Sequence, residues 1–270
     1  MEDLGNGLMF DSEARVYRHG DRVLPGVHET IRRRLVGKTG HARNARVREY
    51  RDETTDGARG LAGGIKTHAQ LERYYNHGEL PVREHEYSRA IRGVLARMNL
   101  RGVRCEVGVY NLACGYATRI DGVAHDRAGR PVVLEFKTGS VGAFYDASGC
   151  WARGLRDKLL RAGVSSSACG RAMVQGVLGA LAHAGITGRD VGAYRVIVLR
   201  AYQGSEGTQT THNEIDLARP AVREAVNAIV RTLQTRNASG QAGTRPAKRT
   251  VHRTVHKQVS VPRRRRPRAM

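Results

Sequence analysis

The clearest chemical signal in the sequence comes from Asp121, Glu135 and Lys137, which lie on either side of a predicted turn. Turn-forming residues at Asp126–Arg130 separate two apolar runs, which predicts a β-hairpin. If the hairpin is centred on Ala128, Asp121 faces Glu135, because residues equidistant from the centre lie opposite one another. Lys137 comes two residues after Glu135 and therefore shares its face of the strand. A shift of the turn by one residue would break this pairing.

Two carboxylates that are held together without a counter-ion repel each other, so such a pair either takes up a proton or binds a cation. Oxygen ligands favour Mg²⁺ or Mn²⁺, and the backbone carbonyl of Phe136 could complete the site. A lysine beside the ion can orient a water or hold the phosphate under attack. The set therefore predicts phosphodiester hydrolysis. The alternative is a surface hairpin with an ordinary ion pair, Glu135 with Lys137 or Asp121 with Arg119.

The elements that must position these side chains follow from hydrophobic periodicity. It predicts helices over residues 67–76, 84–98, 151–162, 168–184 and 216–235, and strands over residues 103–111, 115–124, 131–137 and 192–201. Thr67 is the expected N-cap of the first helix. This order predicts an α/β fold in which helices flank a mixed β-sheet.

The charge of the chain points to a polyanionic partner. Among 270 residues, 46 are Lys or Arg and 25 are Asp or Glu, which gives a net charge of +21. Forty of the 46 basic residues are arginine. Such a bias also reflects a GC-rich genome, so composition alone does not establish nucleic-acid binding. We expect one domain over residues 1–235, with an N-terminal segment of about residues 1–60 and a catalytic core of about residues 61–235.

Residues 236–270 lack acids and helical periodicity, and we expect them to form a disordered basic tail. The tail ends in four consecutive arginines: Arg263, Arg264, Arg265 and Arg266. These predict contacts with nucleic-acid phosphates or a nuclear import signal. The alternative is a solvated tail that raises DNA affinity without specificity.

Several classes of protein are excluded. The sequence has no apolar run of about 18 residues and no signal peptide, so we expect no membrane partner and an intracellular protein. The four cysteines are scattered without a C-x-x-C pair, which favours reduced thiols over a disulfide framework or a zinc site. No phosphate-binding loop of the Walker type is present.

The motifs around the hairpin resemble the PD-(D/E)XK nucleases, and in particular their RecB-type exonuclease branch. That branch typically reads G-x-(I/V)-D, followed by a strand that ends in (D/E)-(Y/F)-K-T-G. The second pattern is matched by Glu135–Gly139, whereas Arg119 stands where the first pattern usually has glycine. The segment Gly64–His68 is similar to the G-x-x-x-H motif of the branch. Segment Tyr17–Ile31 is similar to an N-terminal segment of viral and mitochondrial members.

The resemblance implies a restriction-endonuclease-like core in which Asp121 and Glu135 bind the metal, His68 adds a ligand and Lys137 supports the attacking water. It also implies the absence of an iron–sulfur cluster, because the four-cysteine spacing of cluster-containing members is missing. Gln175 fits the first half of the Q-x-x-x-Y motif, but Gly179 replaces the tyrosine. Gln175 thus contacts substrate or simply packs in the core.

Two further acids are candidates for roles around the metal. Glu106 stands where the family often has a glutamate, and we expect it to support the metal ligands. Glu72 follows His68 by one helical turn and either orients it or is a solvated charge. His68 itself, taken alone, favours an ordinary histidine of the core or surface, and only Gly64 and the set of Asp121, Glu135 and Lys137 favour a ligand role.

The leading hypothesis is a Mg²⁺- or Mn²⁺-dependent DNA nuclease, in particular an exonuclease acting on single strands or duplex ends in replication, recombination or repair. Arginines in residues 31–51 and the tail would follow the phosphate backbone. The alternatives are an inactive nucleic-acid-binding or packaging protein on the same fold, and a site-specific endonuclease of the superfamily. The tail and the composition suggest a viral protein or one from the nucleus of a eukaryotic cell.

Overall fold

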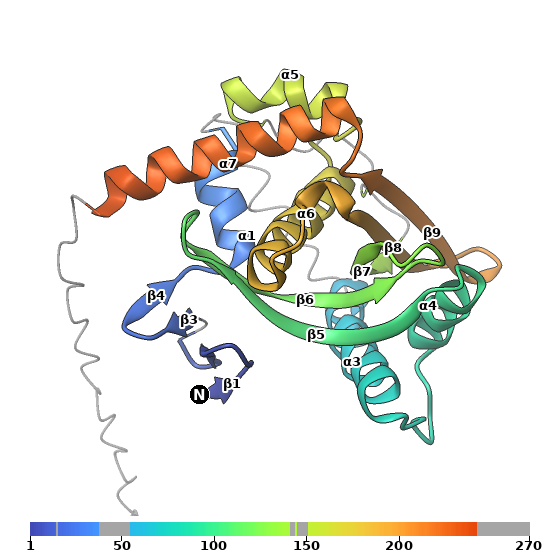
Figure 1. Cartoon of the computed structure of the whole chain (residues 1–270). Coiled ribbons are helices and arrows are strands. Elements are labelled where there is room, and N and C mark those ends of the chain that lie inside the picture. Colours follow the sequence, from blue (N-terminus) through green and yellow to red (C-terminus); the bar gives the residue numbers. More distant parts are fainter. Residues whose placement is uncertain (15, 38–54, 141–143, 145–150, 242–270) are drawn as a thin grey trace, which may run out of the picture.

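A computed structural model of the chain describes residues 1–14, 16–37, 55–140, 144 and 151–241 (Figure 1). Its centre is a five-stranded sheet whose strands are β5 (Arg101–Asn111), β6 (Tyr116–His125), β7 (Pro131–Ser140), β8 (Arg195–Gly204) and β9 (Gly207–Asp216). The strands neighbour one another in this order. Strands β7 and β8 run parallel and the other neighbours are antiparallel, so the sheet is mixed.

Helices cover both faces of this sheet (Figure 1). On one face lie α3 (Thr55–His77) and α4 (Glu86–Arg97), and on the other lie α5 (Arg153–Arg161), α6 (Ala168–Thr187) and α7 (Pro220–Gln241). Each face has its own hydrophobic core, one built with α3 and α4 and the other mainly with α5, α6 and α7. The expected α/β class, a mixed sheet flanked by helices, is therefore confirmed.

The long helix α6 is closed by its sequence at both ends. The side chain of Ser167 accepts a hydrogen bond from the N–H of Gly170, which caps the N-terminus. Gly188 ends the helix with φ of 67°, a left-handed conformation that glycine adopts without steric cost. A short 3-10 turn, η2 (Val191–Ala193), then leads into β8. Between these ends, helix α6 packs over the strands that carry the predicted catalytic residues.

A second, smaller sheet precedes this core. Its strands are β1 (Glu2–Asp3), β2 (Leu8–Asp11), β3 (Val16–His19) and β4 (Arg22–Leu24), all antiparallel. Leu8 and Leu24 pack with Ala117 of β6, which joins the two sheets. A helical segment follows, with α1 (Val27–Thr30) continuing into the π-helical turn η1 (Ile31–Leu35).

Several elements differ from the sequence predictions, which did not include the four-stranded sheet. Helix α3 begins at Thr55, so Thr67 is not its N-cap but lies inside it, where its hydroxyl donates to the carbonyl of Gly63 at 2.7 Å. Strand β9 was not predicted, and the helix expected from residue 216 begins at Pro220. Helix α7 continues to Gln241, into the segment expected to be a disordered tail.

The remainder of that tail, with the four arginines at 263–266, lies outside the described residues. In the part of the chain that is described, no helix combines the length and apolar character needed to cross a membrane.

Candidate metal centre and catalytic group

The site lies where β6 and β7 separate. Their pairing runs from His125↔Pro131 to Gly122↔Leu134, which is the register of a hairpin centred on Ala128. Two residues beyond Leu134, the N–H of Phe136 donates to Oδ2 of Asp121 at 2.7 Å instead of to a backbone carbonyl. The carboxylate of Asp121 therefore occupies the gap between the two strands.

This gap also receives the carbonyl that the sequence suggested as a ligand. Within a strand, the N–H and C=O of one residue point to the same edge. Because the N–H of Phe136 faces Asp121, its carbonyl faces the same gap. Beyond Leu134, β7 keeps its parallel pairing with β8 as far as Ser140, so the opening is on the β6 side alone.

Three side chains converge at the gap. His68, Glu106 and Asp121 each offer a ligand atom, and these atoms all lie within 4.8 Å of one another. Nδ1 of His68 is 3.1 Å from Oε1 of Glu106 and 3.6 Å from Oδ1 of Asp121. One imidazole nitrogen and two carboxylates are a donor set suited to a divalent cation.

Glu106 reaches this group through an unusual backbone conformation. It has φ of 55° inside β5, which is the left-handed region that a glutamate rarely adopts. Its neighbours Cys105 and Val107 pair with Gly122 and Ile120, so Glu106 lies opposite Asp121. Cys105 packs in the core under α3 and α4, whereas Val107 packs against the other core.

The strand therefore exchanges its two faces at Glu106. Such a conformation costs about 1–3 kcal/mol and persists only where the surrounding structure holds it. Sequence analysis gave Glu106 a supporting role, whereas the structure places it beside Asp121 and His68 as a potential ligand. A single sequence carries no signal of a left-handed residue within a strand, apart from the glutamate that the family often has there.

A close helix–strand contact positions His68. A Cβ atom at Gly64, one turn earlier in α3, would lie 2.8 Å from Oγ1 of Thr138 on β7. Only a glycine lets the helix approach the strand so closely, which gives the G-x-x-x-H pattern a physical reason. The ring of His68 then meets the ring of Phe136 edge-on, with 6.0 Å between the centroids.

Electrostatics keep the histidine charged while no cation is bound. Burial lowers the pKa of His68, but the carboxylates of Asp121 and Glu106 outweigh it and raise the pKa to about 9. The protonated ring thus balances the two acids. A cation that bound to Nδ1 would have to displace this proton.

Glu135 and Lys137 form a second group beside the first. Glu135 is 2% exposed and accepts a hydrogen bond from the ammonium of Lys137. Nζ of Lys137 also lies 3.4 Å from Oε1 of Gln175 on α6, so Gln175 contacts the lysine that the sequence predicts to be catalytic. Burial, followed by the negative charge of Asp121, raises the pKa of Glu135.

Glu135 is thus within electrostatic reach of Asp121 but outside the group of three ligand atoms. The sequence predicted Asp121 and Glu135 as the metal pair, and the structure brings Asp121 together with Glu106 and His68 instead. Glu72, the other candidate, is half-buried one turn after His68 and is also outside the group. Its charge acts on Cys105, whose pKa is raised by burial and by Glu106, Asp121 and Glu72.

Sequence analysis missed one residue near the lysine. His28 on α1 has its pKa lowered by desolvation of the ring and by the charge of Lys137, while Asp121 opposes this and Arg171 adds to it. Helix α1 contacts both β6 and α6, which brings His28 to the α6 side of the gap. The signal that could have found it is its place in the segment Tyr17–Ile31, which is similar to a family motif.

Comparison with models of known protein families gives no match for this chain, and a search among curated proteins gives none either. The resemblance to the PD-(D/E)XK nucleases therefore rests on the motifs described above. The geometry of the site is an independent observation.

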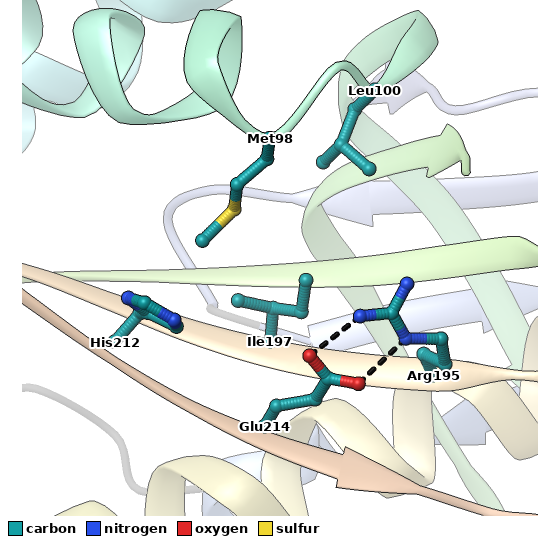
Figure 2. Close-up of a pocket in the computed structure, with 6 residues that line it drawn as sticks. All are labelled: Met98, Leu100, Arg195, Ile197, His212 and Glu214. Atoms are coloured by element: carbon teal, nitrogen blue, oxygen red, sulfur yellow. Dashed lines mark hydrogen bonds and ion pairs between the residues drawn. The ribbon is translucent and has the colours of Figure 1, made fainter. Parts of the chain in front are cut away.

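A small hollow elsewhere on the sheet has a different character (Figure 2). It lies between the end of α4 and strands β8 and β9, measures about 210 Å³, and is lined by Met98, Leu100, Arg195, Ile197, His212 and Glu214. Arg195 and Glu214 pair across its floor through two hydrogen bonds of 2.6 Å. This volume is below the range of about 300–1,000 Å³ that is usual for ligand pockets, and its charged groups are already paired.

Proposed function

We propose that this protein is a divalent-metal-dependent DNA nuclease of the PD-(D/E)XK type, and that it acts as an exonuclease. One observation carries the proposal: the convergence of His68, Glu106 and Asp121 in the gap between β6 and β7, beside the partly buried Lys137–Glu135 pair. Surface ion pairs do not require a strained glutamate or a helix held against a strand by a glycine. The alternative interpretation of the hairpin as an ordinary surface element is thereby weakened.

Each side chain has a role that follows from its contacts. Asp121, Glu106 and His68 would hold Mg²⁺ or Mn²⁺, with the Phe136 carbonyl as a further ligand. The bound ion would activate water and offset the negative charge that develops on the phosphate. Lys137 would donate to the attacking water or to a phosphate oxygen, and Glu135 and Gln175 would hold its ammonium in place.

Cleavage of labelled DNA with and without metal tests the proposal. The purified full chain should degrade linear single-stranded DNA with Mg²⁺ or Mn²⁺ and not with EDTA. Lys137→Ala should lower kcat by about a hundredfold or more, because one charge-stabilising donor to a transition state has that effect. Lys158→Ala is the matched control, since Lys158 lies on α5 and contacts Glu224. Wild-type protein that binds DNA but cuts nothing with either metal would favour an inactive binding protein.

Circular substrates separate the two nuclease alternatives. An exonuclease requires an end and leaves closed circular single-stranded DNA intact. A site-specific endonuclease converts closed duplex circles to discrete linear products.

The absent tyrosine is the feature that most favours an inactive protein. A Cβ atom at Gly179 would lie 3.1 Å from Cγ1 of Ile120, so the helix packs too closely against β6 for a tyrosine. Gln175 nevertheless keeps its contact with Lys137. The variants Gln175→Ala and Lys137→Ala distinguish an active nuclease from an inactive binding protein, because only in an active enzyme do both changes lower kcat.

A further inference from the structure

The three residues proposed to hold the metal, His68, Glu106 and Asp121, are called the metal group below. Four arginines gather near the start of β6, away from this group. Arg32, Arg33 and Arg34 lie on η1, and Arg236 lies near the end of α7; together they are the arginine patch. Nη1 of Arg34 donates to the carbonyl of Cys114 at 3.0 Å, and Nη1 of Arg236 donates to the carbonyl of Arg33 at 3.1 Å. These bonds tie η1, α7 and the β5–β6 turn together, as Figure 1 shows for the neighbouring α1, α7 and turn.

The patch holds like charges close together. Glu29 contacts Arg33 at 2.6 Å and Arg32 at 3.6 Å, so one acid faces two arginines whose side chains are 68% and 52% exposed. Burial lowers the pKa of Arg34, and the guanidinium groups of Arg236 and Arg33 lower it further. Arginine clusters that are anchored through carbonyl oxygens keep further N–H donors in a fork that matches phosphate oxygens.

The segment formed by α1 and η1 connects the arginine patch to strand β6, which carries Asp121. The carbonyl of Pro25, just before α1, accepts from the N–H of Ala117 at 3.1 Å, and Asp121 lies four residues further along β6. Cys114, which holds Arg34, is seven residues from Asp121. Strand β6 begins at Tyr116, five residues before Asp121, so at about 3.3 Å per strand residue the patch is roughly 17 Å from the metal group along β6.

We propose that the arginine patch binds the phosphate backbone of the DNA strand whose end occupies the metal group, several nucleotides away from the bond that is cut. This inference deepens the proposed function, on which its catalytic part rests. Duplex DNA advances about 3.4 Å per nucleotide and an unstacked single strand advances more, so a span of roughly 17 Å corresponds to at most about five nucleotides. A trinucleotide has only one phosphate besides the one that is cut, and it lies too close to the site to reach the patch, whereas a 20-mer spans the distance.

Substrate length and salt test the patch. The variant Arg33→Gln with Arg236→Gln is compared with the control Arg97→Gln with Arg219→Gln, which removes the same charge from exposed arginines at the end of α4 and just before α7. For a 20-nucleotide thymidine strand, the patch variant should show a KM about tenfold higher with unchanged kcat. For a thymidine trinucleotide, its kcat/KM should equal that of the wild type.

Binding without metal separates failure of this inference from failure of the proposed function. In EDTA, the affinity of the 20-mer is measured against salt concentration. The negative slope of log K against log salt should become shallower by about 1.4 in the patch variant, because each of the two lost phosphate contacts on a single strand contributes about 0.7. An unchanged slope, or an equal change in the control, overturns the patch even if the enzyme cuts DNA. A reduced slope supports it even if the wild type cuts nothing.

Discussion

Oδ2 of Asp121 accepts a hydrogen bond of 2.7 Å from the backbone N–H of Phe136, so a side chain takes the place of the next rung of the β6–β7 ladder. The two strands are thereby held apart at the point where they carry functional groups. The other oxygen, Oδ1, faces His68 at 3.6 Å. One carboxylate thus completes the sheet with one oxygen and faces His68 with the other.

The two functions of Asp121 can be separated by substitution. In Asp121→Asn, the amide oxygen can still accept from Phe136, so the free energy of unfolding should stay within about 1 kcal/mol of the wild type. Asp121→Ala leaves a buried N–H without its acceptor and should cost about 1–3 kcal/mol. Both variants should lose Mn²⁺ binding in calorimetry. Equal destabilisation by the two changes would contradict this division of labour.

The strained backbone at Glu106 predicts that glycine is more stable than alanine at this position, the reverse of the usual order in a strand. In an ordinary strand interior, glycine is less stable than alanine by roughly 0.5–1 kcal/mol. At φ of 55° the order should reverse, so that metal-free Glu106→Gly is more stable than Glu106→Ala by about 1 kcal/mol or more. Denaturant unfolding of the two variants measures this difference directly.

Both Glu106 variants should bind Mn²⁺ much more weakly than the wild type. Glu72→Gln is the matched control, because it removes a carboxylate from a residue outside the group of ligand atoms. Its Mn²⁺ affinity should stay within about twofold of the wild type. A loss as large as that of Glu106→Ala would show that Glu72 also holds the ion.

The sequence was sufficient to predict the main hairpin and most of the helices, because local periodicity and turn chemistry determine them. The register about Ala128 was correct because the turn at Asp126–Arg130 is closed by its own hydrogen bonds, such as that from the N–H of Asp126 to the carbonyl of Arg130. The polar strand β9 lacks a strong apolar alternation and is held by its ten-residue pairing with β8, so no local pattern identified it.

The site was predictable only in part. Asp121, Lys137 and His68 follow from motifs, but the approach of Glu106 to Asp121 and His68 depends on the left-handed backbone at Glu106. That conformation is imposed by long-range pairing with β6, which local sequence does not specify. His28 likewise reaches the site only through the docking of α1 on β6 and α6.

The contact between Gly64 and Thr138 predicts a substitution that contradicts helix propensity. Within a helix, Gly→Ala normally stabilises by about 1 kcal/mol. Gly64→Ala should instead destabilise and weaken Mn²⁺ binding by about tenfold, because the new methyl group would lie 2.8 Å from Oγ1 of a stiff β-branched residue and push α3 away from β7. Adding Thr138→Ala removes that oxygen and should restore the affinity. Thr138→Ala alone serves as the control.

Asp126 gives a prediction about pH that does not involve the metal group. Its Oδ1 accepts from the N–H groups of Ala128 and Arg130, and its Oδ2 accepts from the guanidinium groups of Arg130 at 3.0 Å and Arg195 at 3.2 Å. Burial opposes the charge, but these donors outweigh it and lower the pKa of Asp126 below its usual 3.8. The carboxylate thus fastens the β6–β7 turn to β8.

The pH dependence follows from the direction of that shift. A carboxyl group whose pKa is lower in the folded chain contributes stability above its unfolded pKa and loses it as pH falls through the folded value. The free energy of unfolding of the wild type should therefore exceed that of Asp126→Asn by about 1–3 kcal/mol at pH 7, since charged hydrogen bonds are lost. Below about pH 4 the difference should begin to shrink, because the carboxyl of the unfolded wild type takes up a proton there, and it is lost once the folded carboxyl is protonated as well. Urea unfolding of both proteins at pH 7, 5 and 3 measures this, and a difference that stayed constant with pH would mean that the charge of Asp126 contributes nothing to the turn.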